Sequence, residues 1–557
     1  MLALGPRWPE AGREVRAGRR GWSWERTREG GWSRGSWGRG QRMRADTRIH
    51  GTAMDCLVKR ILRVAGDDSD FRAQNGLPQF VEFLHGSAFG RQVFDPHFAP
   101  IFVKSSIPCH IRNTKDPTMT ATKISPRTIE LVKATVPVLA EHGITIVATM
   151  YRNMFRDNPE VKPLFNQANQ SSGEHKTRAS QLESFRVQMF PRSTQPPAPG
   201  SQQLTLTHAV VAYAANIDNP AVLLPAIMRI AHKHASIDIR PDQYAIVGKH
   251  LLGAIKEVLG DAATPEIMAA WAEAYAVLAD LFIDVENQLR HENASKIGGF
   301  TGFRTCRVVK KVAESDSVYS FYLVPKDGGP LPMYKAGQYV CFRLNIPGVG
   351  LVHRNYSLSA APGSDEFRVS IKREPGARGF AAGVVSNHFH DDVHVGDEVD
   401  MAPPYGDFSL VSSDLPPVFI AAGIGITPMF SMFQHFRQAH PARPVHFIQC
   451  MRNGHLHPLK EEVDQVAGTD AHVVVHSIYS APTDEDVEGV DYQTAGHFTL
   501  ELLQSIVPDN EREFYFTGPI KFMRDVRVAL HKWGVPSSRI HYECFGPHTN
   551  DIEEGLT

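Results

Sequence analysis

Four adjacent residues combine a cation, an amide, an aromatic ring and a hydroxyl: Arg354, Asn355, Tyr356 and Ser357. They lie in the alternating run 352–359, which predicts a β-strand. Alternate side chains of a strand share a face, so we expect Arg354 and Tyr356 to point the same way. An arginine can bind pyrophosphate oxygens bidentately, a tyrosine ring can lie against an isoalloxazine, and a serine can reach its ring nitrogens. The run therefore predicts a flavin site, with an ordinary barrel strand as the alternative.

A strand, a glycine turn and a helix are predicted further downstream. The apolar run 418–422 indicates a buried parallel strand. The turn that follows and the start of the next helix consist of Gly423, Ile424, Gly425, Ile426, Thr427 and Pro428. Two glycines between a strand and a helix are the context that a dinucleotide loop requires, and a proline suits the first turn of a helix. We therefore predict a nucleotide-binding loop, with a generic α/β domain as the alternative.

His234 ends an amphipathic segment and is a candidate metal ligand, although a histidine in such a place is usually solvated. Tyr244 and Glu286 lie in later helical segments and could fold back on its imidazole. A carboxylate beside a ligating histidine makes that histidine more basic and pushes electron density onto iron. Tyr151 places a hydroxyl among apolar residues, where it is suited to donate a hydrogen bond to a ligand of the iron.

The elements that must position these residues fall into two blocks. From about 126 to 292 the periodicity is helical, and the predicted helices span 128–139, 143–155, 221–234, 241–259 and 265–289. Ser125 is expected to cap the first helix, with Pro126 at its first position. After residue 295, short strands alternate with turns, which predicts an antiparallel barrel with strands at 304–312, 318–324, 337–344, 352–359 and 367–373.

Two further flavin contacts are predicted in this barrel. Tyr339 lies in the third strand, and a helix is expected to begin after Gly383. The amides of its first turn, including those of Val384 and Ser386, would face the flavin pyrophosphate. Two histidine pairs in polar surroundings are interpreted as solvated: His388 with His390, and His455 with His457.

Composition restricts the class of protein. The 557 residues carry 59 Lys and Arg against 60 Asp and Glu, so the net charge of −1 gives no support for nucleic-acid or membrane-surface binding. No apolar run reaches the length of about 18 residues that a membrane span needs. The six cysteines form no CxxC pair, which favours a reducing compartment. We expect a cytoplasmic monomer.

Residues 1–123 are interpreted as a low-complexity, disordered extension. Five of the seven tryptophans lie among its glycines and arginines, yet no periodic apolar pattern accompanies them. A translated leader upstream of a start at Met119 is the favoured origin. An Arg/Gly RNA-binding arm is one alternative, and a presequence for mitochondrial location is the other.

On these motifs the chain resembles the fungal-type flavohaemoglobins. Residues 125–292 are similar to their globin domain, and residues 300–551 are similar to their FAD and NAD(P)H reductase half. The matching stretches of the globin part are 132–137, 155–165, 169–170, 233–234, 243–248 and 292–295. In the reductase half the match includes 514–519 and 541–547 beside the flavin strand and the glycine loop.

The resemblance implies haem b with its iron, FAD and NAD(P)H as cofactors. It makes His234 the proximal iron ligand, Tyr151 the distal tyrosine, and Tyr244 with Glu286 the proximal hydrogen-bonding pair. Lys233 and Glu543 would tune redox potentials. The nicotinamide cofactor would be lined by the loop from Gly423 to Pro428 and by Cys544, Phe545, Gly546 and Pro547.

One departure from the family lies in the globin part. Residues from about 180 to 203 interrupt the expected distal helix with a proline-rich stretch, through which a helix cannot pass. The insert is either a tolerated loop or, as we favour, a retained intron. The family's distal glutamine has no clear counterpart, and His175 and Lys176 remain alternatives.

The expected organisation is a multidomain chain. It comprises the extension 1–123, an all-α globin haem domain at 124–295, an antiparallel β-barrel FAD domain at 300–410 and an α/β NAD(P)H domain at 411–551. The expected activity is nitric oxide dioxygenation, in which NO and O2 give nitrate with electrons passing from NAD(P)H through FAD to haem. A flavin reductase with a damaged globin and a haem sensor of O2 or NO are the alternatives. The choice between NADH and NADPH stays open.

Overall fold

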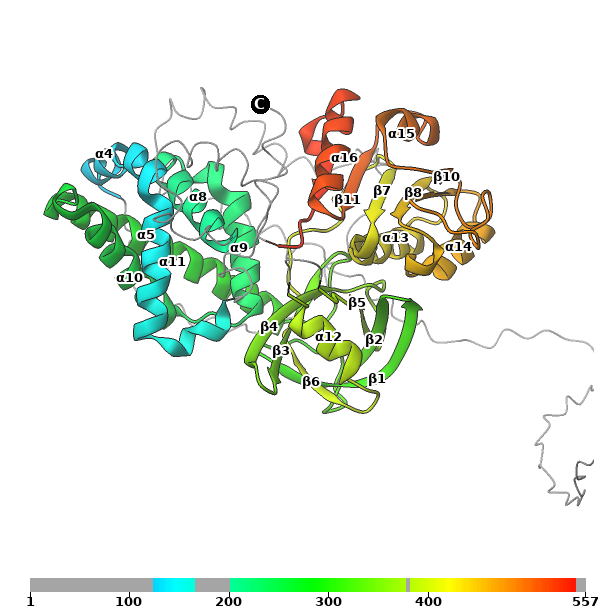
Figure 1. Cartoon of the computed structure of the whole chain (residues 1–557), viewed down its shortest axis with the longest axis horizontal. Helices are drawn as coiled ribbons and strands as arrows, with labels where there is room; N and C mark the ends of the chain where they lie inside the picture. Colours follow the sequence, from blue (N-terminus) through cyan, green and yellow to red (C-terminus); the bar gives the residue numbers. More distant parts are fainter. Residues whose placement is uncertain (1–123, 166–200, 377–380, 547–557) are drawn as a thin grey trace, which may run out of the picture. The chain divides into compact units, whose positions relative to one another are not determined.

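The computed structural model describes residues 124–165, 201–376 and 381–546. The first part of the described chain is helical (Figure 1). Its α-helices are α4 (Pro126–Ala134), α5 (Val136–Asp157), α8 (Ser201–Ala215), α9 (Leu224–Ser236), α10 (Pro241–Leu259) and α11 (Pro265–Ala294). No strand occurs among the described residues of this part, so the prediction of an all-α domain is confirmed.

The first two helices begin as local sequence rules require, but at different bounds from those predicted. Ser125 caps α4 by accepting a hydrogen bond from the amide of Thr128 at 3.1 Å, and Pro126 is the first helical residue. The prediction of one continuous helix over 128–139 is wrong, because the chain breaks at Thr135. The reason is Pro137, which lacks an amide proton and is tolerated only in the first turn of a helix, where α5 places it.

Two other bounds differ from the prediction. A 3-10 turn over Pro220–Leu223 precedes α9, so that helix begins at Leu224. Helix α8 begins at Ser201 and therefore includes the last residues of the predicted insert. The rest of the insert lies outside the described residues, as do both candidates for the distal position, His175 and Lys176.

The second part is an antiparallel barrel. Its strands are β1 (Arg304–Ser315), β2 (Val318–Pro325), β3 (Tyr339–Ile346), β4 (Gly350–Ser357), β5 (Phe367–Lys372) and β6 (Glu398–Met401), in the sheet order β4-β3-β6-β1-β2-β5. A bridge between Leu358 and Val369 joins the end of β4 to β5 and closes the barrel. Helix α12 (Val384–Asp391) packs on the barrel through buried Val385 and Phe389; Figure 1 shows the helix at the strands of the barrel. The prediction of a barrel with a helix after Gly383 is confirmed.

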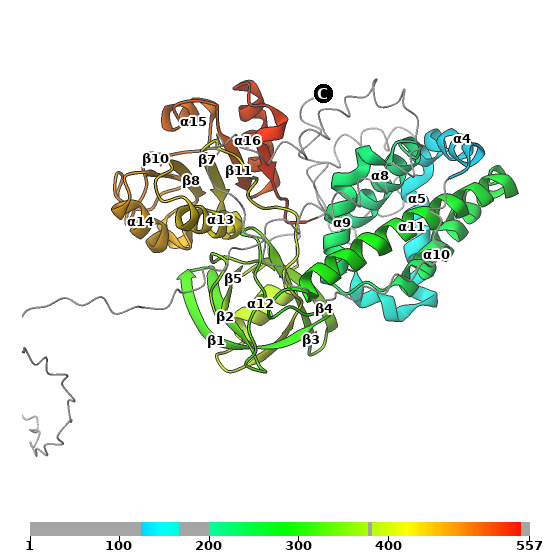
Figure 2. The ribbon, with the colours of Figure 1, turned by 180° about the vertical axis from the view of Figure 1, so that it is seen from behind.

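The third part is a parallel sheet with helices on both faces. The strands are β7 (Pro417–Ala422), β8 (Val445–Met451), β9 (Val473–Tyr479), β10 (Thr494–Ala495), β11 (Glu513–Thr517) and β12 (Ile540–Tyr542), in the order β10-β9-β8-β7-β11-β12. Helices α13 (Ile426–Ala439) and α14 (Lys460–Thr469) cover one face. Helices α15 (Leu500–Ile506) and α16 (Ile520–Lys532) cover the other, as Figure 2 also shows. This is the predicted α/β architecture.

In the described ranges, no single helix is long and apolar enough to cross a bilayer. The pair α4 and α5 meets this criterion of length and composition when taken together, but the two helices are bent by 67° at their junction.

The packing of two aromatic rings at the centre of the parallel sheet predicts how a substitution there changes the stability of the fold. Phe433 of α13 stacks on Phe447 of β8 with ring centroids 5.0 Å apart, and both side chains are fully buried. We expect Phe433→Ala to lower the free energy of unfolding by about 3–5 kcal/mol, because the cavity it leaves cannot collapse in a close-packed core. Urea denaturation followed by near-UV circular dichroism measures this. The control is Val490→Ala, at a side chain 68% exposed; an equal loss in both variants would contradict the prediction.

Candidate functional site

Three residues from three helices meet at the imidazole of His234. His234 lies in the last turn of α9, Tyr244 in the first turn of α10, and Glu286 in the C-terminal third of α11. Its Nδ1 atom is 2.9 Å from Tyr244 Oη and 2.9 Å from Glu286 Oε1. Tyr244 Oη also donates to Glu286 Oε1. The structure thus brings together the residues that were expected to fold back on the histidine.

The side chains of this cluster differ in their exposure to solvent. The side chain of Glu286 is 1% exposed and that of His234 is 32% exposed. Burial raises the pKa of Tyr244 well above its usual range, and the carboxylate of Glu286 acts in the same direction, so the phenol stays protonated and donates. Arg290, one helical turn after Glu286, places Nη2 3.7 Å from Glu286 Oε2 and adds a positive charge.

The donor set at His234 fits a haem iron. Nδ1 is engaged by the carboxylate and the phenol, whereas Nε2 has no hydrogen-bond partner within the described residues. An imidazole held through one nitrogen by a carboxylate presents the other to a metal in a defined orientation. Phe282 of α11 lies beside the ring, with centroids 5.7 Å apart, and contributes an apolar wall.

The other residues predicted for the haem side lie on α5 and α9. Tyr151 of α5 is 4% exposed and packs in the apolar core. Its ring is 5.6 Å from that of Phe155 and 5.4 Å from that of Phe165. Lys233 precedes His234 on α9 and is exposed. The ring of Tyr151 therefore lies among apolar side chains.

The flavin strand β4 pairs with β3, and the register of the two strands shows which side chains lie on the same face of the sheet. Tyr339 lies directly opposite Ser357, Cys341 opposite Asn355, and Phe342 opposite Arg354. Arg354 and Tyr356 therefore share one face, as predicted, while Tyr339, Asn355 and Ser357 share the other. Arg354 is partly buried, and its Nη1 donates to the carbonyl of His353 at 2.8 Å.

Tyr356 connects this strand to helix α12. Its ring centroid is 5.8 Å from that of Phe389 in α12 and 6.1 Å from that of Phe342 in β3. Burial raises the pKa of Tyr356 above its usual range, so the phenol remains neutral. A neutral aromatic ring between the flavin strand and the helix suits contact with an isoalloxazine.

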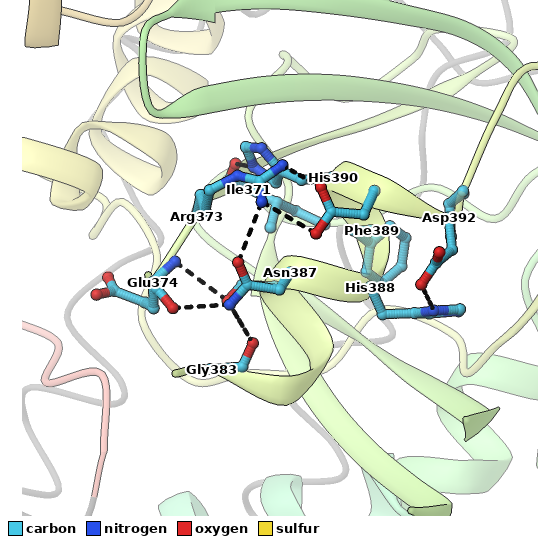
Figure 3. A network of polar contacts seen from close by, with 12 residues as sticks. Ile371, Arg373, Glu374, Gly383, Asn387, His388, Phe389, His390 and Asp392 are labelled. Carbon is cyan, nitrogen blue, oxygen red and sulfur yellow. Dashed lines mark hydrogen bonds and ion pairs between the residues drawn. The ribbon is translucent and has the colours of Figure 1, made fainter. Parts of the chain in front are cut away.

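The N-terminus of α12 fits an anion. Gly383 precedes the helix and provides no side-chain cap for its first amides. The carbonyls around it are already satisfied: Asn387 Nδ2 donates to those of Glu374 at 2.7 Å and Gly383 at 2.8 Å (Figure 3). Ser386 is buried, and its hydroxyl donates to the carbonyl of Gly383 at 3.2 Å. Uncapped amides at a helix start bind phosphate, so the residues present fit the FAD pyrophosphate.

The glycine loop lies where β7 ends and α13 begins. Gly423 has φ of +53°, and a 3-10 turn over Gly423–Gly425 leads into the helix. Gly425 lies against the end of β11: a Cβ built on it would be 2.4 Å from the carbonyl oxygen of Thr517. Thr427 Oγ1 donates to the carbonyl of Ile424 at 3.1 Å and closes the turn. The backbone at Gly425 therefore packs directly against β11, whereas a Cβ built on Gly423 would have no neighbour within 4 Å.

The C-terminal residues reach the same sheet edge. Strand β12 pairs with β11, and Glu543, Cys544, Phe545 and Gly546 follow it. Phe545 is 46% exposed. Pro547, also predicted for this site, lies outside the described residues. Glu543 Oε2 is buried without a hydrogen-bond partner among the described residues, and burial raises the pKa of Glu543 to about 8, with the nearby Asp407 acting in the same direction.

Contacts between the helical part and the barrel were not foreseen from the sequence. Asn293 Nδ2 donates to the carbonyl of Pro404 at 2.9 Å, and His232 Nδ1 accepts from the amide of Gly406 at 3.1 Å. Tyr405 lies between Pro404 and Gly406 in the chain; it packs against the helices and is paired with Tyr339 through two backbone hydrogen bonds of 2.9 Å. The flavin strands therefore connect directly to α9.

The expectation that both histidine pairs are solvated is wrong for two of the four residues. His390 is 7% exposed and its Nε2 donates to the carbonyl of Ile371 at 2.8 Å. His457 is 3% exposed and lies between Gln449 and Tyr479, each at 2.9 Å. A polar neighbourhood in the sequence does not reveal a partner that a distant strand supplies.

Known protein families match all three parts of the described chain. The family model "Globin" matches residues 148–282, "Oxidoreductase FAD-binding domain" matches 305–410, and "Oxidoreductase NAD-binding domain" matches 419–528. A flavohemoprotein of Chromobacterium violaceum is 43% identical over 430 residues, which are 77% of this chain and 100% of that protein. A flavohemoprotein of Bordetella parapertussis is 42% identical over 426 residues, 76% of this chain and 98% of that protein.

The chain is also similar to a solved structure of a flavohemoglobin. The crystal structure of a flavohemoglobin from Malassezia yamatoensis, with bound FAD and haem, aligns with a TM-score of 0.59 and 26% identity. It covers 76% of this chain and 100% of that one.

The close approach at Gly425 predicts a defect in nucleotide binding. In Gly425→Ala the new methyl group would meet the backbone of Thr517, which cannot move aside as a side chain could. We expect the KM for NADH or NADPH to rise by about tenfold, since small displacements of a binding loop have large effects. The matched control is Gly468→Ala, where a Cβ has no neighbour within 4 Å. Equal KM values in the two variants would show that the loop tolerates the methyl group.

The raised pKa of Glu543 predicts a pH dependence of stability. The folded chain keeps the proton up to about pH 8, whereas the unfolded chain releases it near 4.5. Stability from this group is therefore present below pH 4.5 and is lost as the pH rises to 8. Glu543→Gln stays neutral, so its advantage over wild type should grow from pH 5 to pH 8.5, to on the order of 2 kcal/mol after discounting for partial exposure. Thermal unfolding at several pH values measures this difference; a constant difference contradicts the prediction.

Proposed function

The chain belongs to the flavohaemoglobin family, and on that premise we propose that it is a nitric oxide dioxygenase that detoxifies NO. Two NO and two O2 would take the two electrons of one NAD(P)H and give two nitrate ions, NAD(P)+ and one proton. Haem, FAD and a nicotinamide dinucleotide are the cofactors that the matched domains take. The family and its matched domains show that the chain is an oxidoreductase. The nitric oxide dioxygenase reaction is our proposal.

The observation that carries the proposal is the hydrogen bonding of His234 Nδ1. We assign Nε2 of this residue as the iron ligand. Glu286, buried and 2.9 Å from Nδ1, draws the shared proton towards itself and gives the imidazole imidazolate character. Tyr244 stays protonated and donates to the same carboxylate oxygen, Oε1. An oxygen-storage protein has no need of so strong an electron donor, whereas cleavage of an O–O bond does.

Haem and FAD, when bound, supply the one-electron and hydride chemistry. On the haem side, Tyr151 would hold a proton at Oη for a polar ligand, and Lys233 would tune the potential. On the flavin side we assign Tyr339, Arg354, Asn355, Tyr356 and Ser357 to the ring and pyrophosphate, with the amides of Val384 and Ser386. The contact from Tyr339 through Tyr405 to α9 supports a short path between the two centres.

For the nicotinamide we assign the loop from Gly423 to Pro428 and the residues from Cys544 to Pro547. Glu543, neutral at pH 7 because burial raises its pKa to about 8, would add no negative charge beside the reacting ring. We also propose the domain bounds 124–295, 300–410 and 411–551. The four described cysteines are free thiols, which supports a reducing, cytoplasmic setting.

The test is NO consumption by the full chain reconstituted with haemin and FAD, measured with an electrode in air and NADH or NADPH. We expect rapid NO loss in wild type, none in His234→Ala, and a decrease in kcat of about 10–100-fold in Tyr151→Phe. The matched control is Tyr213→Phe, another buried tyrosine, whose hydroxyl donates to the carbonyl of Ala274 at 2.8 Å.

Two results would contradict the proposal. A preparation without a Soret band that still reduces ferricyanide would be a flavin reductase. A stable oxygenated spectrum without NO loss would indicate a sensor. Glu286→Gln supplies an independent readout, because a weaker proximal donor should lower the iron–histidine stretching frequency in resonance Raman spectra.

A further inference from the structure

The C-terminus of helix α12 is capped by a lysine from a distant strand. Lys311 of β1 places Nζ 3.2 Å from the carbonyl oxygen of Phe389, 2.8 Å from that of His390 and 2.8 Å from that of Val393. The last carbonyls of a helix have no partner within the helix. An ammonium group has three N–H donors, so the whole donor capacity of Lys311 is used on this one helix end.

A β-bulge selects Lys311 rather than its neighbour for this role. Val308 pairs with Leu323 and Lys310 with Tyr322, so Val309 is an extra residue in β1. A bulge shifts the alternation of side chains by one. Lys310 is therefore exposed on the outside, with Nζ 4.5 Å from the ring centroid of Tyr322. Lys311 instead passes inward, with Nζ 5.2 Å from the ring centroids of both Tyr319 and Phe321.

Other contacts hold the same end of the helix. Phe389 is fully buried in the barrel core, with its ring 5.2 Å from that of Phe321. His390 donates to the carbonyl of Ile371, and Figure 3 shows how both lie beside Arg373. Arg373 in turn binds the carboxylate of Asp391 at 2.5 and 3.0 Å. The C-terminal half of α12 is thus clamped, while the amides of its first turn are uncapped.

We propose that Lys311 is a positioning residue for FAD: by capping the C-terminus of α12, it sets where the N-terminal amides of Val384 and Ser386 meet the flavin pyrophosphate. This inference rests on the proposed role of α12 in binding FAD. Its effect is geometric. Eight residues make a helix about 12 Å long, and a charge at that distance is screened by a Debye length of about 8 Å.

The experiment compares two flavins on two variants of the full chain. Bound FAD is removed, and the apo-protein is titrated with FAD and with riboflavin, which lacks the pyrophosphate. Lys311→Met keeps the apolar stem but removes all three donors. Lys310→Met is the matched control, because it removes an adjacent lysine of the same strand that is exposed and has its Nζ over the ring of Tyr322. We expect the Kd for FAD to rise about tenfold in the Lys311 variant only, and the Kd for riboflavin to stay unchanged.

A second variant and a second readout keep the inference testable if Lys311→Met folds poorly. Lys311→Gln retains two donors, and we expect an intermediate rise in the Kd for FAD. The 31P resonances of bound FAD should shift in this variant and not in Lys310→Met, because the pyrophosphate would sit differently on the amides. A change in folding stability alone would leave these resonances unmoved.

Three results would overturn the inference. The first is equal FAD affinity in the Lys311 and Lys310 variants. The second is loss of FAD and riboflavin affinity by the same factor, which would indicate a general structural defect. In the third, wild type itself binds the two flavins equally well, so that α12 takes no part in pyrophosphate binding and the premise fails. NO consumption by wild type is measured separately and distinguishes that case from failure of the proposed reaction.

Discussion

The buried carboxylate of Glu286 is the constraint on which the haem side of this molecule depends. A carboxylate at 1% exposure is unfavourable unless it is hydrogen-bonded or paired. His234 and Tyr244 supply the hydrogen bonds, and Arg290 supplies a nearby opposite charge. These partners come from three helices, so α9, α10 and α11 must converge at one point. The same convergence leaves Nε2 of His234 as the available ligand atom.

The reductase half has two helices whose N-terminal ends can bind an anion. Helix α12 presents uncapped amides beside the flavin strand, and α13 begins directly after the glycine turn of β7. Anions bind at such ends because the amides are unpaired and the peptide dipoles align. Such a helix end binds an anion in a defined position only when the rest of the helix is held in place. Lys311 and Arg373 hold α12, and a core of buried aromatic rings holds α13.

Most features that the sequence did not reveal depend on contacts between residues far apart in the chain. The break at Thr135 was visible in principle, since Pro137 is a local signal. The burial of His390 and His457 was not, because their partners Ile371 and Tyr479 lie on strands paired only in the folded chain. The contacts of Asn293 and His232 with the barrel are likewise invisible in the sequence. Each joins residues more than a hundred positions apart.

The sequence by itself determined the order of architectures, the flavin strand, the glycine loop and the identity of His234, Tyr244 and Glu286 as a set. These follow from periodicity, capping and turn chemistry, or from motifs of a few adjacent residues that the resemblance to a family brought together. Only the tertiary structure decided the distances at His234 Nδ1, the faces of β4 and the inward path of Lys311. The reason is that strand register and helix packing depend on the whole core, and a single bulge at Val309 reverses which side chain points inward.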